Sequence, residues 1–269
     1  MKNNKKKILL FILLTFFLGV SFAQKKLESI KNNSFKIGEY LKYKVYYQSL
    51  LTGKVTAGEA TIEIKESSKT FQGRKAYHVI GTGYTKGFFN LFFKEIDKYE
   101  SYIDQDALVP WLFVRRVNEG GYKISQDVYF DRFKNIAQDL IKKKNYDVPN
   151  DIQDLLSAYY YARLTDSSKL KQGDTISINT LIDFKVFPLK LRYIGKVILK
   201  TELGRVNCMK FYPILQVDKV FSDEDAMVIY FSDDQNHLPI MLEAQILVGS
   251  VKMELIKYSN TVMPLNIKK

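Results

Sequence analysis

The chain has little of the chemistry that cysteine and histidine supply: one cysteine and two histidines in 269 residues. A single cysteine cannot form an intramolecular disulfide, so the core alone must hold the fold together. His78 and His237 lie far apart in the sequence, and neither has a second histidine nearby. The spacing therefore favours no zinc site, and we expect neither a metal nor a cofactor.

Beyond the N-terminus, the chain lacks an apolar run long enough to cross a bilayer. Residues 1–7 are basic, residues 8–20 are almost entirely apolar, and small side chains follow at Ser21 and Ala23. This order is typical of a secretory signal peptide at residues 1–23, cleaved after Ala23. The alternative is an uncleaved membrane anchor, for which the run is short. The run is not followed by a cysteine, which argues against lipidation, so we expect a periplasmic or secreted protein without a transmembrane anchor after processing.

Negative charge is in deficit, with 29 Asp and Glu against 41 Lys and Arg and a net charge of +12. Removal of the four lysines of the signal peptide lowers the net charge to +8. The excess is dispersed, and its densest cluster is IKKKNY at residues 141–146. Outside the cytoplasm this surface favours weak contact with anionic lipid or polysaccharide, not nucleic acid, although ordinary solvated strands explain it as well.

From Phe35 onward the dominant hydrophobic period is two. In EYLKYKVYY, residues 39–47, apolar side chains alternate with polar ones, which predicts a half-buried strand. GEATIEIKE, residues 58–66, repeats the pattern. Further strands are expected at residues 75–84, 94–104, 109–119, 121–131, 135–143, 174–184, 190–200, 205–217, 226–232, 239–248 and 251–258.

One segment breaks this alternation. In PNDIQDLLSAYYYARL, residues 149–164, apolar side chains recur at helical spacing, and Asn150 with Gln153 suits a capping box. We predict one amphipathic helix at residues 151–164, with its apolar face packed on the sheet. That face comprises Ile152, Leu155, Leu156, Tyr159 and Ala162.

These elements predict an all-β, mainly antiparallel fold. The long sheet would be curled into a roll or open barrel, with the helix near residues 151–164 plugging or covering an open end, because closure protects strand edges. No low-complexity linker or internal repeat divides the chain. We therefore expect a polar leader at 24–34, a single β-rich domain at 35–260 and a C-terminal tail at 261–269.

Aromatic side chains gather at residues 88–93, FFNLFF, between the strands expected at 75–84 and 94–104. Three roles fit this run: a cap on the end of the roll, the mouth of an apolar cavity, or a contact with a membrane or partner. Curled β-sheets hold apolar ligands in aromatic-lined cavities. The candidate ligand-binding residues are Phe88, Phe89, Phe92, Phe93, Trp111 and Tyr159.

Catalytic patterns are weak. Cys208 lies in an apolar strand, which is typical of a core residue, and no Gly-x-Ser-x-Gly motif is present. Glu95 and Asp97 share a strand face, but pairing with neighbouring lysines explains them better than acid–base chemistry. The acidic clusters at 222–225 and 232–236 lack the spacing of a calcium loop and suit turns. We expect no catalytic residues and no enzyme.

Seven segments occur in a recognisable order: FKIGEYLKYKVYY, GKVTAGEATIEI, AYHVIGTGYT, KEIDKYESYID, LVPWLFVRRVNEGGY, DIQDLLSAYYYAR and DDQNHLPIMLEA. In this order the chain resembles a bacterial exported family catalogued as domain of unknown function 3108, over residues 35–258. The resemblance implies a periplasmic β-rich domain of the roll or barrel type. It implies no activity and assigns no catalytic residue.

The sequence therefore favours non-catalytic binding of an apolar or amphipathic envelope molecule, such as a lipid. The alternative is a structural or assembly factor that contacts another envelope protein through the aromatic loop or a sheet edge.

Overall fold

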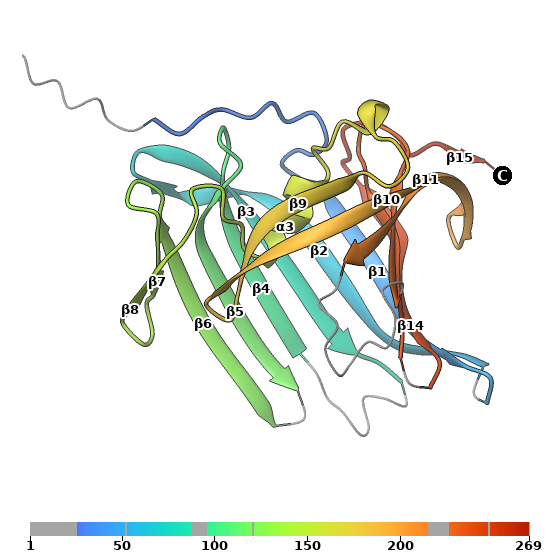
Figure 1. Ribbon diagram of the computed structural model, residues 1–269. Coiled ribbons are helices and arrows are strands. Elements are labelled where there is room, and N and C mark those ends of the chain that lie inside the picture. Colours follow the sequence, from blue (N-terminus) through green and yellow to red (C-terminus); the bar gives the residue numbers. More distant parts are fainter. Residues whose placement is uncertain are drawn as a thin grey trace, which may run out of the picture.

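The computed structural model describes residues 26–51, 53–87, 96–119, 121–214, 226–246 and 248–268. Within these residues the chain forms one antiparallel sheet of 15 strands and one α-helix (Figure 1). The first eight strands are β1 (Tyr40–Ser49), β2 (Gly53–Phe71), β3 (Arg74–Thr85), β4 (Ile96–Asp104), β5 (Pro110–Glu119), β6 (Tyr122–Asp131), β7 (Ile136–Asp139) and β8 (Lys144–Asp147). After the helix α3 (Leu155–Ala162) and the 3₁₀ turn η1 (Ser167–Lys169) come β9 (Thr175–Ile182), β10 (Lys185–Thr201), β11 (Gly204–Ile214), β12 (Met227–Ser232), β13 (Pro239–Gln245), β14 (Ser250–Ser259) and β15 (Ile267–Lys268).

The sheet consists of two meanders, which are joined where the first strand, β1, pairs with β14. Strands β1 to β8 lie side by side in sequence order, as do β9 to β14, and β1 pairs with β14. The predicted all-β fold with a curled sheet and one helix is confirmed. Alternation did not predict β8 and β15, which have four and two residues, although β7, also of four residues, lies within the strand expected at residues 135–143.

Local irregularities bend the sheet into its curl. The register of β1 shifts against both neighbours, between Lys42 and Tyr43 and between Val45 and Tyr46. In β10 the register against β11 shifts near Gly195, which has φ +141°. Such bulges increase strand twist and bend the ladder, and they let the two meanders face each other.

Among the described residues the two edge strands, β8 and β9, do not pair with each other, and side chains bridge the gap on this side of the sheet. Leu181 of β9 and the adjacent Phe184 pack in a cluster with Phe113 of β5. Nearby, Nη1 of Arg115 donates to a carboxylate oxygen of Asp183 at 3.0 Å. The curled sheet is therefore closed by packing along this line.

The helix α3 is shorter than predicted, and its cap differs. Asp154, not Asn150, is the N-cap, and Ser157 completes the capping box that the sequence had suggested for Gln153. Residues 150–151 form a turn, and Gln153, directly before the cap, forms a bridge with Thr180 of β9. Pairing with a strand edge thus overrides the helical periodicity of residues 151–153.

The helix lies inside the curl and contacts both meanders. Leu156 and Tyr160 pack among residues of β2, β3 and β4, whereas Ala162 packs against β10 and β11. Figure 1 shows α3 between the long strands β2 to β5 and the crossing pair β9 and β10. At Gly81 of β3, an added Cβ would lie 3.3 Å from Leu156 Cδ2, so glycine permits this close approach.

The predicted leader and tail both contact the domain. The amide of Ile30 donates to the carbonyl of Asp106 at 2.8 Å, and Ser34 is buried. At the other terminus Leu265 is buried, and β15 pairs with β11.

Candidate functional site: an apolar cavity beside the helix

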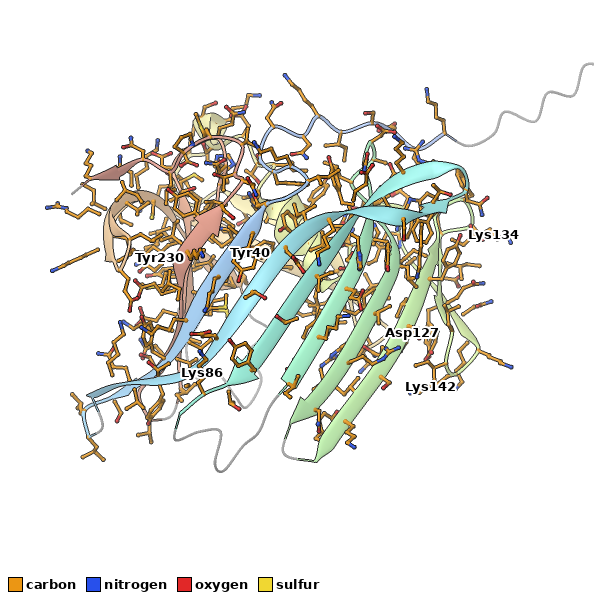
Figure 2. The ribbon with its side chains drawn as sticks, turned by 180° about the vertical axis from the view of Figure 1, so that it is seen from behind. Tyr40, Lys86, Asp127, Lys134, Lys142 and Tyr230 are labelled. Carbon is orange, nitrogen blue, oxygen red and sulfur yellow. The ribbon has the colours of Figure 1, made fainter. Side chains whose placement is uncertain are left out.

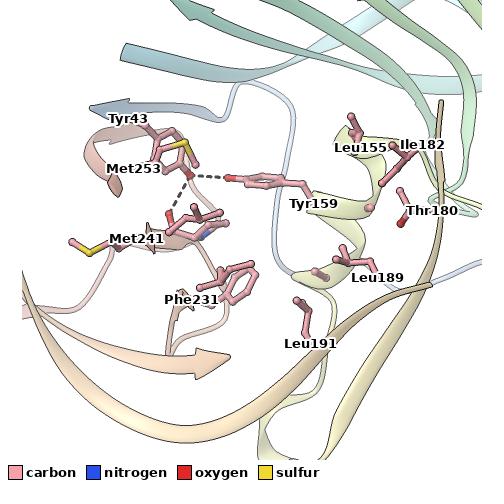
Figure 3. A pocket seen from close by; sticks show the side chains of 15 residues that line it. Tyr43, Leu155, Tyr159, Thr180, Ile182, Leu189, Leu191, Phe231, Met241 and Met253 are labelled. Carbon is pink, nitrogen blue, oxygen red and sulfur yellow. Dashed lines mark hydrogen bonds between the residues drawn. The ribbon is translucent and has the colours of Figure 1, made fainter. Parts of the chain in front are cut away.

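A cavity of about 200 Å³ lies between α3 and the sheet. Its walls come from α3 and from strands β1, β9, β10, β12, β13 and β14 (Figure 3). The lining side chains of the described residues are Ala, Leu, Ile, Met, Phe, Pro, Tyr and one Thr, so none of them carries a charge at neutral pH.

The cavity exists because the two faces of α3 differ in bulk. One stripe, at i, i+3, i+4 and i+7, faces the cavity: Leu155, Ala158, Tyr159 and Ala162. On the opposite face, the larger Leu156 and Tyr160 fill the space against β2 to β4. The short side chains of Ala158 and Ala162 leave part of the space on their own side unfilled, and this volume is the cavity.

The polar atoms of the lining satisfy one another. Tyr43 donates its hydroxyl hydrogen to the carbonyl of Pro239 at 3.1 Å, so Tyr159 is the donor in the 2.7 Å bond to Tyr43 (Figure 3). Thr180 donates to the carbonyl of Ile178 at 3.3 Å. Burial raises the pKa of Tyr43 and that of Tyr159 above their ordinary values, which keeps both phenols neutral. The surface offered to a ligand is therefore apolar.

Leu155 and Ile182 mark the mouth of the cavity. Each is 36% exposed, more than the other lining residues. Figure 3 shows their side chains close together at one end of the helix. The structure corrects the prediction that Leu155 packs on the sheet: this side chain lies at the cavity rim instead.

Asp154 fixes the first turn of α3. Its Oδ1 accepts hydrogen bonds from the amides of Leu156 and Ser157, each at 2.8 Å, and its Oδ2 accepts one from the Ser101 hydroxyl at 2.6 Å. Burial raises the pKa of the Asp154 carboxyl to about 6, although these hydrogen bonds oppose the shift. The cap ties the cavity-lining helix directly to β4.

Arg163 fixes the other end of α3. Its guanidinium donates to both carboxylate oxygens of Glu39, at 2.6 and 2.8 Å, and to the carbonyls of Asn236 and Ser34, at 3.0 and 2.8 Å. Both charged side chains are fully buried. Burial lowers the pKa of Arg163, but the Glu39 charge outweighs that effect and the net shift is upward. The pair locks the helix to the start of β1.

The predicted ligand-binding residues have three different outcomes. Tyr159 lines the cavity, as expected for a binding residue. Trp111 is fully buried, stacks on Phe71 and donates to Asp104 Oδ2 at 3.0 Å, and it is not among the described lining residues. The four phenylalanines of the aromatic run, Phe88, Phe89, Phe92 and Phe93, lie outside the described residues.

Sequence reasoning missed most of the cavity wall. Tyr43, Phe231, Met241 and Met253 were expected in strands, but no role was assigned to them. A hydrophobic period of two predicts which side chains of a strand face inward. It does not predict how much volume remains unfilled between the facing elements. The alanines at positions 158 and 162, on an otherwise bulky helix, are the one signal that points to unfilled space.

Of the titratable residues considered for chemistry, Cys208, His78 and His237 lie in the described part of the chain, whereas Glu95 and residues 222–225 lie outside it. Within the described part of the chain, no group of three or more His, Cys, Asp or Glu is placed to hold a metal. Cys208 is buried, and this burial raises the pKa of its thiol to about 12. His78 Nε2 lies 2.6 Å from Glu100, and His237 Nδ1 lies 2.8 Å from the carbonyl of Arg163. No helix among the described residues is long and apolar enough to span a membrane.

Residues 42–256 match the family model described as "Protein of unknown function (DUF3108)". A beta-barrel-like protein of domain of unknown function DUF1849 from Brucella abortus has a similar fold, with TM-score 0.56 and 11% identity over 84% of this chain and 98% of that one. A DUF1089 family protein from Pseudomonas aeruginosa matches with TM-score 0.37 and 10% identity, over 67% and 87% of the two chains. No curated protein matches the sequence.

Proposed function

The chain belongs to the DUF3108 family, whose description names no function, and we propose that it is an exported protein that binds the apolar chain of an amphipathic molecule without catalysis. Support comes from one observation above all, the open and uncharged cavity beside α3. Apolar cavities of this kind stay dry and take up apolar ligands, because water inside them finds no hydrogen-bond partners.

The size of the cavity limits the ligand. Drug-sized molecules occupy pockets of roughly 300–1,000 Å³, whereas an engineered cavity of about 150 Å³ holds benzene. A volume of about 200 Å³ therefore suits one alkyl or acyl chain end and not a whole lipid. Met241 and Met253 line the cavity, and their flexible side chains adapt to ligands of different shape.

The position of the mouth suggests how such a ligand lies. Its chain enters between Leu155 and Ile182, and its polar group stays at the surface, because the hydroxyls of the described lining residues are already hydrogen-bonded to one another or to the backbone. The tyrosine pair then acts as a fixed wall. This orientation requires no group that performs acid–base or nucleophilic chemistry.

Filling the cavity from the helix tests the proposal. Ala158→Leu together with Ala162→Leu places side chains into empty space, so the melting temperature should change little while uptake of the apolar probe N-phenylnaphthylamine is lost. Ala244→Leu is the matched control, since Ala244 is half-buried in β13 and lies outside the lining. Unchanged fluorescence enhancement in the filled variant would refute the cavity as the binding site.

A further inference from the structure

The two ends of the curled sheet differ in polarity. Because neighbouring strands are antiparallel, the β1–β2, β5–β6 and β13–β14 hairpins project from one end, called here the hairpin end. The β2–β3, β4–β5 and β12–β13 connections lie at the opposite end. In Figure 2, Lys86 marks the hairpin end, where β3 finishes, and Lys134 lies near the opposite end.

Large apolar side chains crowd the hairpin end without cover. Leu50 and Leu51, at the β1–β2 turn, are 107% and 92% exposed. In the β13–β14 hairpin Val248 is 61% exposed, and Tyr122 at the β5–β6 hairpin is 64% exposed. The first two hairpins meet, because the Tyr47 hydroxyl donates to the carbonyl of Val248 at 2.9 Å. Contiguous exposed apolar side chains on a soluble domain mark an interaction site.

The charges nearby favour an anionic partner. Among the described residues 46–56 and 245–252 there are two lysines, Lys54 and Lys252, and no acidic residue. Lys123 adds a third, exposed cation at the β5–β6 hairpin. The turns at the opposite end carry both signs, with Asp106, Asp233 and Asp234 as well as Lys134. The hairpin end has one acid in its β9–β10 turn, Asp183, and this carboxylate is paired with Arg115 at 3.0 Å.

We propose that the hairpin end is a docking surface for an anionic phospholipid bilayer, into whose interface Leu50, Leu51 and Val248 insert. Fully exposed leucines beside tyrosines and lysines match the chemistry of the interface, where apolar groups meet acyl chains, aromatic rings lie at headgroup level and cations meet anionic headgroups. The apolar contact dominates, since Lys252 is already paired with Glu243 at 3.2 Å and Lys54 with Glu254 at 3.8 Å.

Docking in this orientation goes beyond ligand binding but suits it. Ile182 at the cavity mouth is the last residue of β9, and the β9–β10 turn faces the hairpin end because β9 and β10 belong to the same alternating order. The mouth would then face the bilayer. Docking does not depend on the cavity, so each can fail alone.

Vesicle sedimentation tests the docking surface. Wild-type protein should bind vesicles of equal parts phosphatidylcholine and phosphatidylglycerol. Its binding should be several-fold weaker on vesicles of phosphatidylcholine alone, and also on the anionic vesicles at high salt. Leu50→Ser with Leu51→Ser should weaken binding to the anionic vesicles by about tenfold or more, since two leucines no longer leave water. Its melting temperature and its uptake of N-phenylnaphthylamine should stay at wild-type values.

A matched control changes apolar residues away from this end. Ile37 and Ile198 are 43% and 52% exposed, and Ile37→Ser with Ile198→Ser should bind vesicles like wild type. Leu50→Trp provides a direct reading: its emission should shift to the blue on anionic vesicles, against the constant signal of the buried Trp111.

Three results would overturn the proposal. They are absence of wild-type binding to anionic vesicles, equal binding by the Leu50/Leu51 variant, and a dimer in solution that this variant abolishes while vesicles are ignored. The last result would assign the hairpin end to a second copy of the chain. The variant with leucine at positions 158 and 162 should still bind vesicles, which separates a failed cavity from a failed docking surface.

Discussion

The ion pair between Arg163 and Glu39 holds the C-terminal end of the cavity-lining helix, and its removal should be costly. Arg163→Met keeps the approximate length of the side chain but deletes the guanidinium. It leaves the Glu39 carboxylate fully buried, with a Tyr160 hydroxyl at 3.2 Å as its remaining side-chain donor. The carbonyls of Ser34 and Asn236 lose their donors as well.

The expected loss follows from this geometry. Removing one partner of a buried ion pair costs about 3–5 kcal/mol, because the other charge stays desolvated. Total stabilities are typically about 5–15 kcal/mol. For a domain of this size each kcal/mol corresponds to about 2–4 °C, so the melting temperature should fall by roughly 6–20 °C. The double variant Arg163→Met with Glu39→Gln should recover part of the loss, since no charge remains buried.

Urea denaturation of the wild type, both single variants and the double variant gives the free energy of unfolding for a complete cycle. We expect the double variant to be more stable than Arg163→Met alone. Additive losses, with no coupling between the two positions, would refute the conclusion that this pair anchors the helix. A loss below about 1 kcal/mol in Arg163→Met would refute it as well, since that is the range of exposed pairs.

Three further predictions concern the helix and the core. The pKa of Asp154 is raised from 3.8 to about 6, so the folded state favours its neutral form. The stability of wild type relative to Asp154→Asn should therefore fall as pH rises through that window and level off above it, as urea titrations at each pH will show. A difference that stays constant with pH would contradict the raised pKa. Leu155→Ala should cost less than about 2 kcal/mol, because the side chain is at the rim, whereas the buried Leu156→Ala should cost about 2–5 kcal/mol in the same melts; equal losses would contradict the assigned faces. Cys208 should resist thiol reagents at pH 8 until the protein is denatured, since it is buried with a raised pKa, and rapid labelling of native protein would contradict that placement.

Periodicity was sufficient for the sheet and insufficient for the helix boundary. Long strands such as β3 and β6 expose alternate faces over ten residues or more, so their pattern is clear from sequence. The start of α3 depends on a bridge between Gln153 and Thr180, two positions separated in sequence. Helical spacing at Ile152 is a local signal, and it contains no information about that long-range contact.

The candidate site depends still more on distant contacts. Tyr159 was identified from its helix, but its partner Tyr43 lies 116 residues away in β1. The buried pair of Glu39 and Arg163 was also missed, because charged residues in sequence are expected on the surface. Sequence pattern assigns faces to single elements, whereas a cavity and a buried ion pair arise from how those faces meet.

The most direct test of ligand binding is native mass spectrometry of the protein purified without detergent from its own cells. If the cavity beside α3 binds an amphipathic molecule, the spectrum will show an added mass that dissociates on activation. The same preparation of the variant filled by Ala158→Leu and Ala162→Leu will show the polypeptide mass alone. An unliganded wild-type spectrum, or an adduct retained at equal occupancy by the filled variant, would contradict the proposed function.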